Sequence, residues 1–153
     1  MVTQNVQTLR LQTMKRRIFL TFLFLPSLAD AHSNKLGNIL LGHAWGLPSQ
    51  DGETQIFMPL FNSGGSTDTL ISASCDFAKS AELRINNEYT TPAELGFVLE
   101  PKKPFPMRPT AKHIRLMGLT KPLLVGDHIS IILKFMTAGE TKIEVYIQKK
   151  AGE

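Results

Sequence analysis

A regular alternation of apolar and polar residues near the C-terminus limits most strongly how this chain can fold. Within residues 129–135 and 143–147, apolar side chains recur at every second position, and most of the positions between them are polar. Successive side chains point to opposite faces of a β-strand, so a period of two predicts strands with one buried face. Ala138-Gly139-Glu140 separates two such stretches and is typical of a tight turn. We therefore predict a β-hairpin here.

The sequence before this hairpin also reads as short strands joined by turns, and helical periodicity is scarce. Turn-forming Pro, Gly and Asn residues recur between apolar segments. Seven or eight short strands at such spacing predict an all-β fold, either a β-sandwich or a Greek-key barrel. The segments that we expect to form strands ahead of the hairpin are 38–45, 54–62, 69–77, 81–86 and 112–117.

The N-terminus has the layout of a secretory signal peptide. A basic cluster, Met14-Lys15-Arg16-Arg17, precedes the apolar run 18–25, and Ala29-Asp30-Ala31 provides a small-x-small cleavage site. Eight residues rise only about 12 Å as a helix, which is too short to span a hydrocarbon core of about 30 Å. We expect residues 1–31 to be removed, with translation starting at Met1 or at Met14. The mature chain, 32–153, would be one domain in the periplasm without a transmembrane anchor.

Removal of this segment changes the charge of the protein. The full chain has 17 Lys and Arg residues, 13 Asp and Glu residues and a formal net charge of +4. The segment 1–31 contains four of the basic residues and one of the acidic ones, which leaves a net charge of +1. The mature chain has no basic run with interleaved aromatic residues, so we expect no nucleic-acid partner.

Three stretches of the mature chain share motifs with a known family. Residues 37–45 read Gly-Asn-Ile-Leu-Leu-Gly-His-Ala-Trp, residues 107–119 read Met-Arg-Pro-Thr-Ala-Lys-His-Ile-Arg-Leu-Met-Gly-Leu, and residues 121–127 begin with Lys-Pro-Leu and end with Gly-Asp. In combination they resemble the periplasmic copper chaperones called PCu(A)C, over residues 36–148. The resemblance implies a cupredoxin-like β-sandwich that binds Cu(I) and delivers it to a copper-accepting membrane oxidase or assembly factor.

The same resemblance implies where copper ligands should lie. The family binds Cu(I) through two His-x-Met pairs, because soft thioether and imidazole groups suit this soft cation. The first pair falls at Arg84 and Asn86 and the second at His113 and Arg115, so His113 alone is kept. The stretch 87–101, where the family has a further Met, contains none. Guanidinium groups at two ligand positions are expected to repel Cu(I).

Strand alternation indicates which of these side chains share a face. Ile114 and Leu116 are expected to face the core, which leaves His113, Arg115 and Met117 on the outer face. The Met117 thioether is therefore a second candidate ligand, and packing at the sandwich rim is the alternative for it. The same argument turns the side chains at two positions of the strand 81–86 outward, Arg84 and Asn86.

The remaining candidates have competing structural explanations. His32 would become the mature N-terminus, where its amine and imidazole together could chelate copper. We expect His43 to be structural and His128 to be solvated at a turn. Met58 and Met136 lie in apolar segments and are predicted to be in the core. Cys75, the only cysteine, is predicted to be buried, since it alternates in phase with apolar neighbours.

Three functions compete at this stage. The first is a Cu(I) chaperone with a site at His113. The second is a metal-free protein-binding or assembly module, in which Arg84 and Arg115 form a cationic patch for an acidic partner. The third is a copper enzyme that uses His32 and a second His. The common hydrolase, P-loop and Cys-x-x-Cys motifs are absent from the sequence, so we expect no enzyme.

Overall fold

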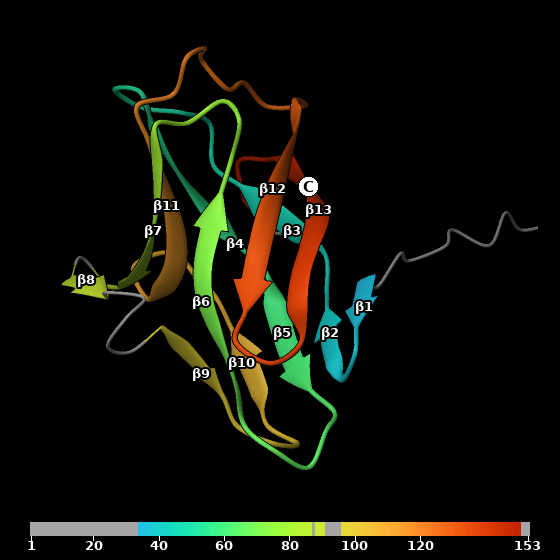
Figure 1. Cartoon of the computed structure of the whole chain (residues 1–153). Helices are drawn as coiled ribbons and strands as arrows, with labels where there is room; N and C mark the ends of the chain where they lie inside the picture. Colours follow the sequence, from blue (N-terminus) through green and yellow to red (C-terminus); the bar gives the residue numbers. More distant parts are fainter. Residues whose placement is uncertain (1–33, 87, 91–95, 151–153) are drawn as a thin grey trace, which may run out of the picture.

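The computed structural model describes residues 34–86, 88–90 and 96–150, which form strands and turns without any helix (Figure 1). The predicted all-β fold is therefore confirmed. The strands are β1 (Asn34–Leu36), β2 (Ile39–Leu41), β3 (Ala44–Gly46), β4 (Glu53–Phe57), β5 (Pro59–Asn62), β6 (Asp68–Ser74), β7 (Ser80–Ile85), β8 (Glu88–Thr90), β9 (Phe97–Leu99), β10 (Pro104–Pro106), β11 (Lys112–Met117), β12 (His128–Phe135) and β13 (Gly139–Ile147).

The strands form two sheets. The larger has the order β8-β7-β11-β4-β3-β13-β12-β6-β9, and the smaller has the order β1-β2-β5-β10. Neighbouring strands are often distant in sequence, as in a Greek key, and the larger sheet curls toward a barrel (Figure 1). All strand pairs are antiparallel except β3 with β13. This arrangement confirms the expected sandwich or barrel.

Two segments predicted as single strands are each divided between the sheets. The segment 54–62 forms β4 in the larger sheet and β5 in the smaller one, with Met58 between them. Pro59 follows directly and has no backbone N–H with which to continue the first ladder. The segment 38–45 divides in the same way at Gly42, where a Cβ atom would lie 2.4 Å from the ring of Pro59. A side chain larger than hydrogen is therefore excluded at this crossing.

The C-terminal hairpin forms as predicted. β12 pairs with β13 from His128 opposite Tyr146 to Phe135 opposite Gly139. The alternating apolar side chains of both strands are buried. The turn occupies residues 136–138, slightly earlier than the predicted turn. At its start the carboxylate of Asp68, which is 7% exposed, accepts hydrogen bonds from the backbone N–H groups of Thr137 and Ala138, both at 2.9 Å.

The core contains most of the expected apolar residues. Met58 is fully buried, as predicted, together with the rings of Phe57, Phe97 and Phe135. The prediction for Met136 is wrong, because its side chain is 69% exposed. It lies in the hairpin turn, beyond the last paired residue of β12. Cys75 is only partly buried and packs against the rim of the core, just after β6 ends.

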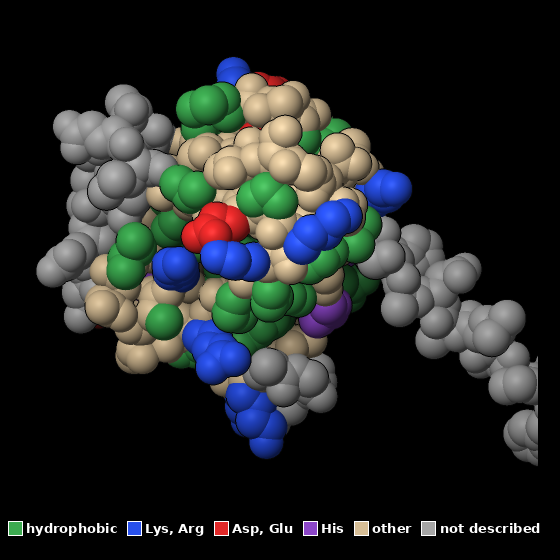
Figure 2. Space-filling model, turned by 90° about the horizontal axis from the view of Figure 1, so that it is seen from below, with side chains coloured by type: hydrophobic (Ala, Val, Ile, Leu, Met, Phe, Trp, Pro, Cys, Tyr) green, Lys and Arg blue, Asp and Glu red, His purple; other side chains and the backbone are tan. Residues whose placement is uncertain are grey.

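Residues 1–33 lie outside the described residues, and with them the predicted signal peptide and His32. Within the described ranges, no helix is long and apolar enough to cross a membrane. Figure 2 shows the end of the molecule that lies lowest in Figure 1, where hydrophobic side chains are surrounded by several Lys and Arg residues.

Candidate metal-binding site

The candidate ligands lie on the outer face of the pair formed by β7 and β11. In the register of this antiparallel pair, His113 is opposite Arg84, Arg115 is opposite Glu82, and Met117 is opposite Ser80. Directly opposed residues share one face of a sheet. The prediction that His113, Arg115 and Met117 share a face is therefore confirmed. The core-facing positions Leu83, Ile114 and Leu116 are at most 1% exposed, also as predicted.

His113 differs from the prediction in its exposure. Although it lies on the outer face, its side chain is only 1% exposed. Its ring centroid is 6.2 Å from that of Phe57 on β4, and its cross-strand neighbour is Arg84, whose side chain is itself 17% exposed. The expectation of a solvent-facing imidazole was wrong, because bulky side chains on both neighbouring strands pack around this position.

The hydrogen bond of His113 determines its tautomer. The Nδ1 atom lies 2.7 Å from the backbone carbonyl of Ala111. A carbonyl oxygen only accepts, so Nδ1 carries the proton and the lone pair of a neutral ring is on Nε2. Burial lowers the pKa of His113 below 6.5, the Ala111 hydrogen bond opposes this shift, and the charges of Arg115 and Arg84 lower the pKa further. The environment therefore favours the neutral imidazole, which is the form that binds metals.

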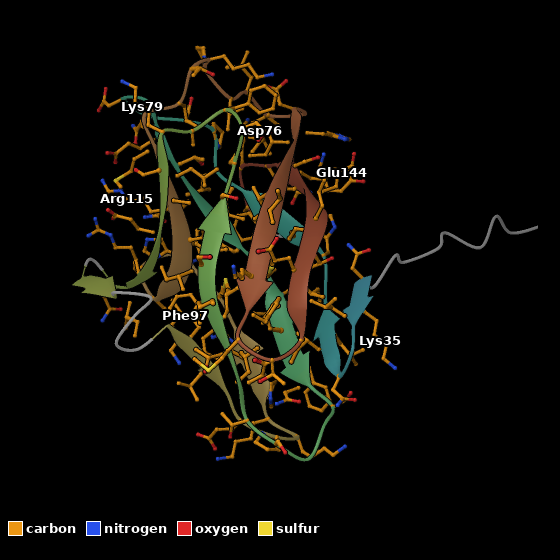
Figure 3. The ribbon with its side chains drawn as sticks, in the orientation of Figure 1. Lys35, Asp76, Lys79, Phe97, Arg115 and Glu144 are labelled. Atoms are coloured by element: carbon orange, nitrogen blue, oxygen red, sulfur yellow. The ribbon has the colours of Figure 1, made fainter. Side chains whose placement is uncertain are left out.

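The two arginines near His113 are both ion-paired. Arg84 donates from Nε to Glu82 Oε2 at 2.8 Å and also from Nη2 to the same oxygen. Arg115, labelled in Figure 3, donates from Nε to Glu53 Oε2 at 2.9 Å and also from Nη2. Glu82 also lies opposite Arg115, so the four charges alternate in sign across β7, β11 and β4. We call Arg84, Glu82, Arg115 and Glu53 the charge ladder.

The charge ladder corrects one prediction. Arg84 and Arg115 were expected to form a cationic patch, but each has a carboxylate partner and the group is formally neutral. The sequence analysis did not assign Glu82 or Glu53 as partners. Glu82 could have been found, since residues 82 and 84 share a face on one strand. Glu53 could not, because it pairs across 62 residues of sequence.

The other candidate ligands do not converge on His113. Met117 is four residues farther along the same strand, which separates the two Cα atoms by about 13 Å. Asn86 follows the end of β7 in a turn with φ of 57° and is exposed. His43, just before β3, and His128, on β12, both contact the Tyr146 ring, with centroid distances of 5.1 Å and 4.3 Å, and neither β3 nor β12 is a neighbour of β11 in the sheet order. Both are exposed, as expected for His128.

The described residues do not provide the two His-x-Met pairs that the resemblance implies. Of the four positions, only His113 offers a metal donor, and the arginines at 84 and 115 are engaged with carboxylates. In the described ranges no group of three or more His, Cys, Asp or Glu side chains is arranged to hold a metal ion. The site therefore combines one imidazole that is protonated on Nδ1 with an ion-pair network that has no net charge.

The fold defines the class of proteins to which this chain is similar. Its architecture matches that of the PCuAC domains, a class of cupredoxin-like β-sandwiches, and the resemblance found in the sequence is thereby confirmed. The chain belongs to the family described as putative lipoprotein LpqE-like, which matches residues 39–147.

Individual relatives agree with this assignment. A putative lipoprotein of Leifsonia xyli, Lxx21020, is 26% identical over 133 residues, which cover 84% of this chain and 80% of that protein. The copper-bound PCuAC domain from PmoF2 is 26% identical, has a TM-score of 0.69 and covers 78% of this chain and 99% of its own. The solution structure of Cu(I)-DR1885 from Deinococcus radiodurans is 20% identical, with a TM-score of 0.62 and coverage of 80% and 85%. At 20% identity, the likeness to Cu(I)-DR1885 shows the fold alone.

Proposed function

We propose that this protein is an exported copper-handling protein in which His113 Nε2 is the donor that engages Cu(I). The observation that supports this most directly is the hydrogen bond from Nδ1 to the carbonyl of Ala111, which leaves Nε2 as the metal-binding atom. Compensation of both neighbouring arginines by carboxylates supports it further, because the expected repulsion of a cation is reduced. The likeness to a copper-bound PCuAC domain agrees with this chemistry.

A single imidazole suggests transfer rather than storage of copper. Cu(I) needs at least one further soft ligand, and we infer that a partner supplies it during ligand exchange. The recipient would be a copper-accepting membrane oxidase or an assembly factor. In this proposal the protein is a carrier and not an enzyme.

The test is a Cu(I) titration of the chain against a chromophoric chelator under anaerobic conditions. We expect His113→Ala to weaken binding at least tenfold and His128→Ala, a matched change of an exposed histidine, to leave it unchanged. The proposal fails if the two variants bind Cu(I) equally well, or if the unchanged chain binds no more tightly than a free imidazole.

A second candidate is a metal-free protein-binding or assembly module. The charge ladder favours it, because ion pairs occupy the positions at which the resembling family has copper ligands. The same titration separates the two functions. Absence of Cu(I) binding in the unchanged chain, together with capture of a periplasmic partner that is lost in a Glu82→Lys variant, would support the module.

We also propose that residues 1–31 are an export signal and that the mature protein acts in the periplasm. The family name of putative lipoprotein and the basic-then-apolar N-terminus both support export. The intact mass of the protein recovered from the periplasm tests this directly. A mass that corresponds to a chain beginning at His32 would agree with the proposal. Such a chain would also have the amine and the imidazole of His32 together at its N-terminus. Cleavage at any other position would exclude His32 as an N-terminal copper ligand.

A further inference from the structure

The outer face of the smaller sheet is apolar although it is not covered by the rest of the described fold. In the register of this sheet, Leu40 is opposite Phe61, and Phe61 is opposite Pro104. A second row pairs Pro59 with Pro106. The three prolines are exposed, whereas Leu40 and Phe61 are half-buried. We call these five residues the small-sheet face. The residues that alternate with them, such as Leu41, Leu60 and Phe105, point into the core.

Exposed cations lie at both edges of the small-sheet face. On β1, Lys35 is opposite Leu40 and so belongs to the same outward row. At the other edge, Lys102 and Lys103 precede β10 and Arg108 follows it. Figure 2, the view from below, shows hydrophobic side chains with Lys and Arg side chains near them and a small acidic patch beside the cations. The nearby carboxylate of Glu100 pairs with Lys103.

We propose that the small-sheet face docks on an anionic lipid surface. Apolar side chains surrounded by Lys and Arg match the two layers of a membrane interface, because the apolar groups reach the acyl boundary while the cations contact the headgroups. Prolines at the interface suit this role, since their backbone nitrogens have no N–H group that would need a partner in lipid.

Two features argue against a protein occupant of the same face. β10 is the edge strand, and two of its three residues are prolines, which blocks the addition of a partner strand. A second copy of this chain would bring like charges together, because the four cations surround the face on both sides. A lipid surface meets neither obstacle.

The position of the sheet in the chain agrees with this orientation. The chain enters the described fold through β1, an edge strand of this sheet. Only eight residues separate Leu25, the end of the apolar run, from Asn34. Fully extended, they span about 30 Å. Until the predicted signal is removed, an apolar run held in the membrane would keep this sheet within that distance of the lipid surface.

Vesicle binding tests the proposal with matched variants of the full chain. The face variant is K35Q/K102Q/K103Q/R108Q, and the control K79Q/K121Q/K142Q/K149Q removes the same charge elsewhere. Each cation near an anionic leaflet contributes roughly fivefold to partitioning. We therefore expect the face variant to bind vesicles of equal phosphatidylglycerol and phosphatidylcholine at least tenfold more weakly than the control. On pure phosphatidylcholine the two should bind alike. Equal binding of both variants to the anionic vesicles overturns the proposal.

A fluorescence measurement tests which face meets the lipid, independently of the charges. Phe61→Trp places an indole probe on the small-sheet face, and Val98→Trp places a control on β9, where Val98 is 49% exposed. With vesicles of brominated phosphatidylglycerol, we expect the fluorescence of the F61W probe to be quenched. The V98W variant should show no more quenching than the unchanged chain. Equal quenching of both probes overturns the proposal. The proposal is also overturned if the face variant no longer self-associates, or no longer captures an acidic protein, while its vesicle binding is unchanged. None of these outcomes depends on copper, so the proposed function is tested separately.

Discussion

Arg115 of β11 and Glu53 of β4 form an ion pair across the two strands that carry His113 and Phe57. Their side chains are 33% and 36% exposed, so water screens the pair and its contribution to stability is small. Its effect on the neighbouring imidazole is more important. Burial is the main cause of the lowered pKa of His113, and the charge of Arg115 lowers it further. Glu53 compensates that charge.

Removal of this carboxylate should therefore be visible at His113. In Glu53→Gln, the charge of Arg115 is no longer compensated, and we expect the pKa of His113 to fall further below its value in the unchanged protein. An NMR titration of the His113 Cε1 proton measures this. Glu140→Gln breaks the Lys134 pair on the hairpin and serves as the control. An unchanged His113 pKa in Glu53→Gln would contradict the electrostatic account.

Replacement of the arginines should create a stronger metal site. The double variant Arg84→His and Arg115→Met places an imidazole opposite His113 and completes a His-x-Met sequence on β11. We expect Cu(I) affinity to rise at least tenfold, because soft ligands replace guanidinium groups. Arg84→Gln with Arg115→Leu removes the same charges without adding ligands and is the matched control. A similar gain in the control would mean that charge, rather than ligand supply, limits binding.

Loss of the Met117 thioether should have little effect. Its Cα atom lies about 13 Å from that of His113 along β11, which is too far for a shared ion. We expect Met117→Leu to change the Cu(I) affinity less than twofold and the free energy of unfolding by less than about 1.5 kcal/mol. A tenfold loss of affinity, measured by chelator competition, would show that Met117 is a ligand.

Stability should depend on the protonation of His113. Its pKa is lowered in the folded protein, chiefly by burial, so below pH 6.5 the unfolded chain binds a proton that the native state resists. The free energy of unfolding should fall as the pH drops from 6.5 to the native pKa of His113, with no further loss from this group below it. Urea denaturation at pH 7.5 and 5.5 tests this. His113→Asn, which can still donate to Ala111, should show a smaller difference between the two pH values.

The buried carboxylate of Asp68 should be a main source of stability near the hairpin turn. It accepts hydrogen bonds from three backbone N–H groups, those of Thr69, Thr137 and Ala138. We expect Asp68→Ala to lower the free energy of unfolding by about 3 kcal/mol, since buried donors lose their partner. Asp68→Asn keeps one acceptor and should lose less. Chemical denaturation of both variants provides the comparison, and equal losses would contradict this explanation.

Local patterns in the sequence predicted much of the fold. β11 was predicted at its observed bounds, 112–117, and the hairpin through β13 formed as expected, because both depend on a period of two in their core-facing apolar residues. The divisions at Gly42 and Met58 were missed, since alternation does not reveal when a strand passes from one sheet to another. The short edge strand β10 was missed because two prolines among three residues read as a turn.

The candidate site was predicted by face but not by environment. Alternation correctly placed His113, Arg115 and Met117 together, whereas the burial of His113 depends on Phe57, a residue distant in sequence. The cationic patch failed for a similar reason, since one of the two carboxylates that neutralise it comes from β4. Charge patterns on one strand do not reveal partners supplied by another.

Met58, the one residue between β4 and β5, gives the two sheets a fixed mutual position. Phe57, beside His113, belongs to the larger sheet, and Phe61, four residues later, belongs to the small-sheet face. These two positions are separated by about 13 Å at most along the chain. If the small-sheet face rests on a membrane, the copper exchange proposed for His113 would take place at a fixed distance from the lipid surface.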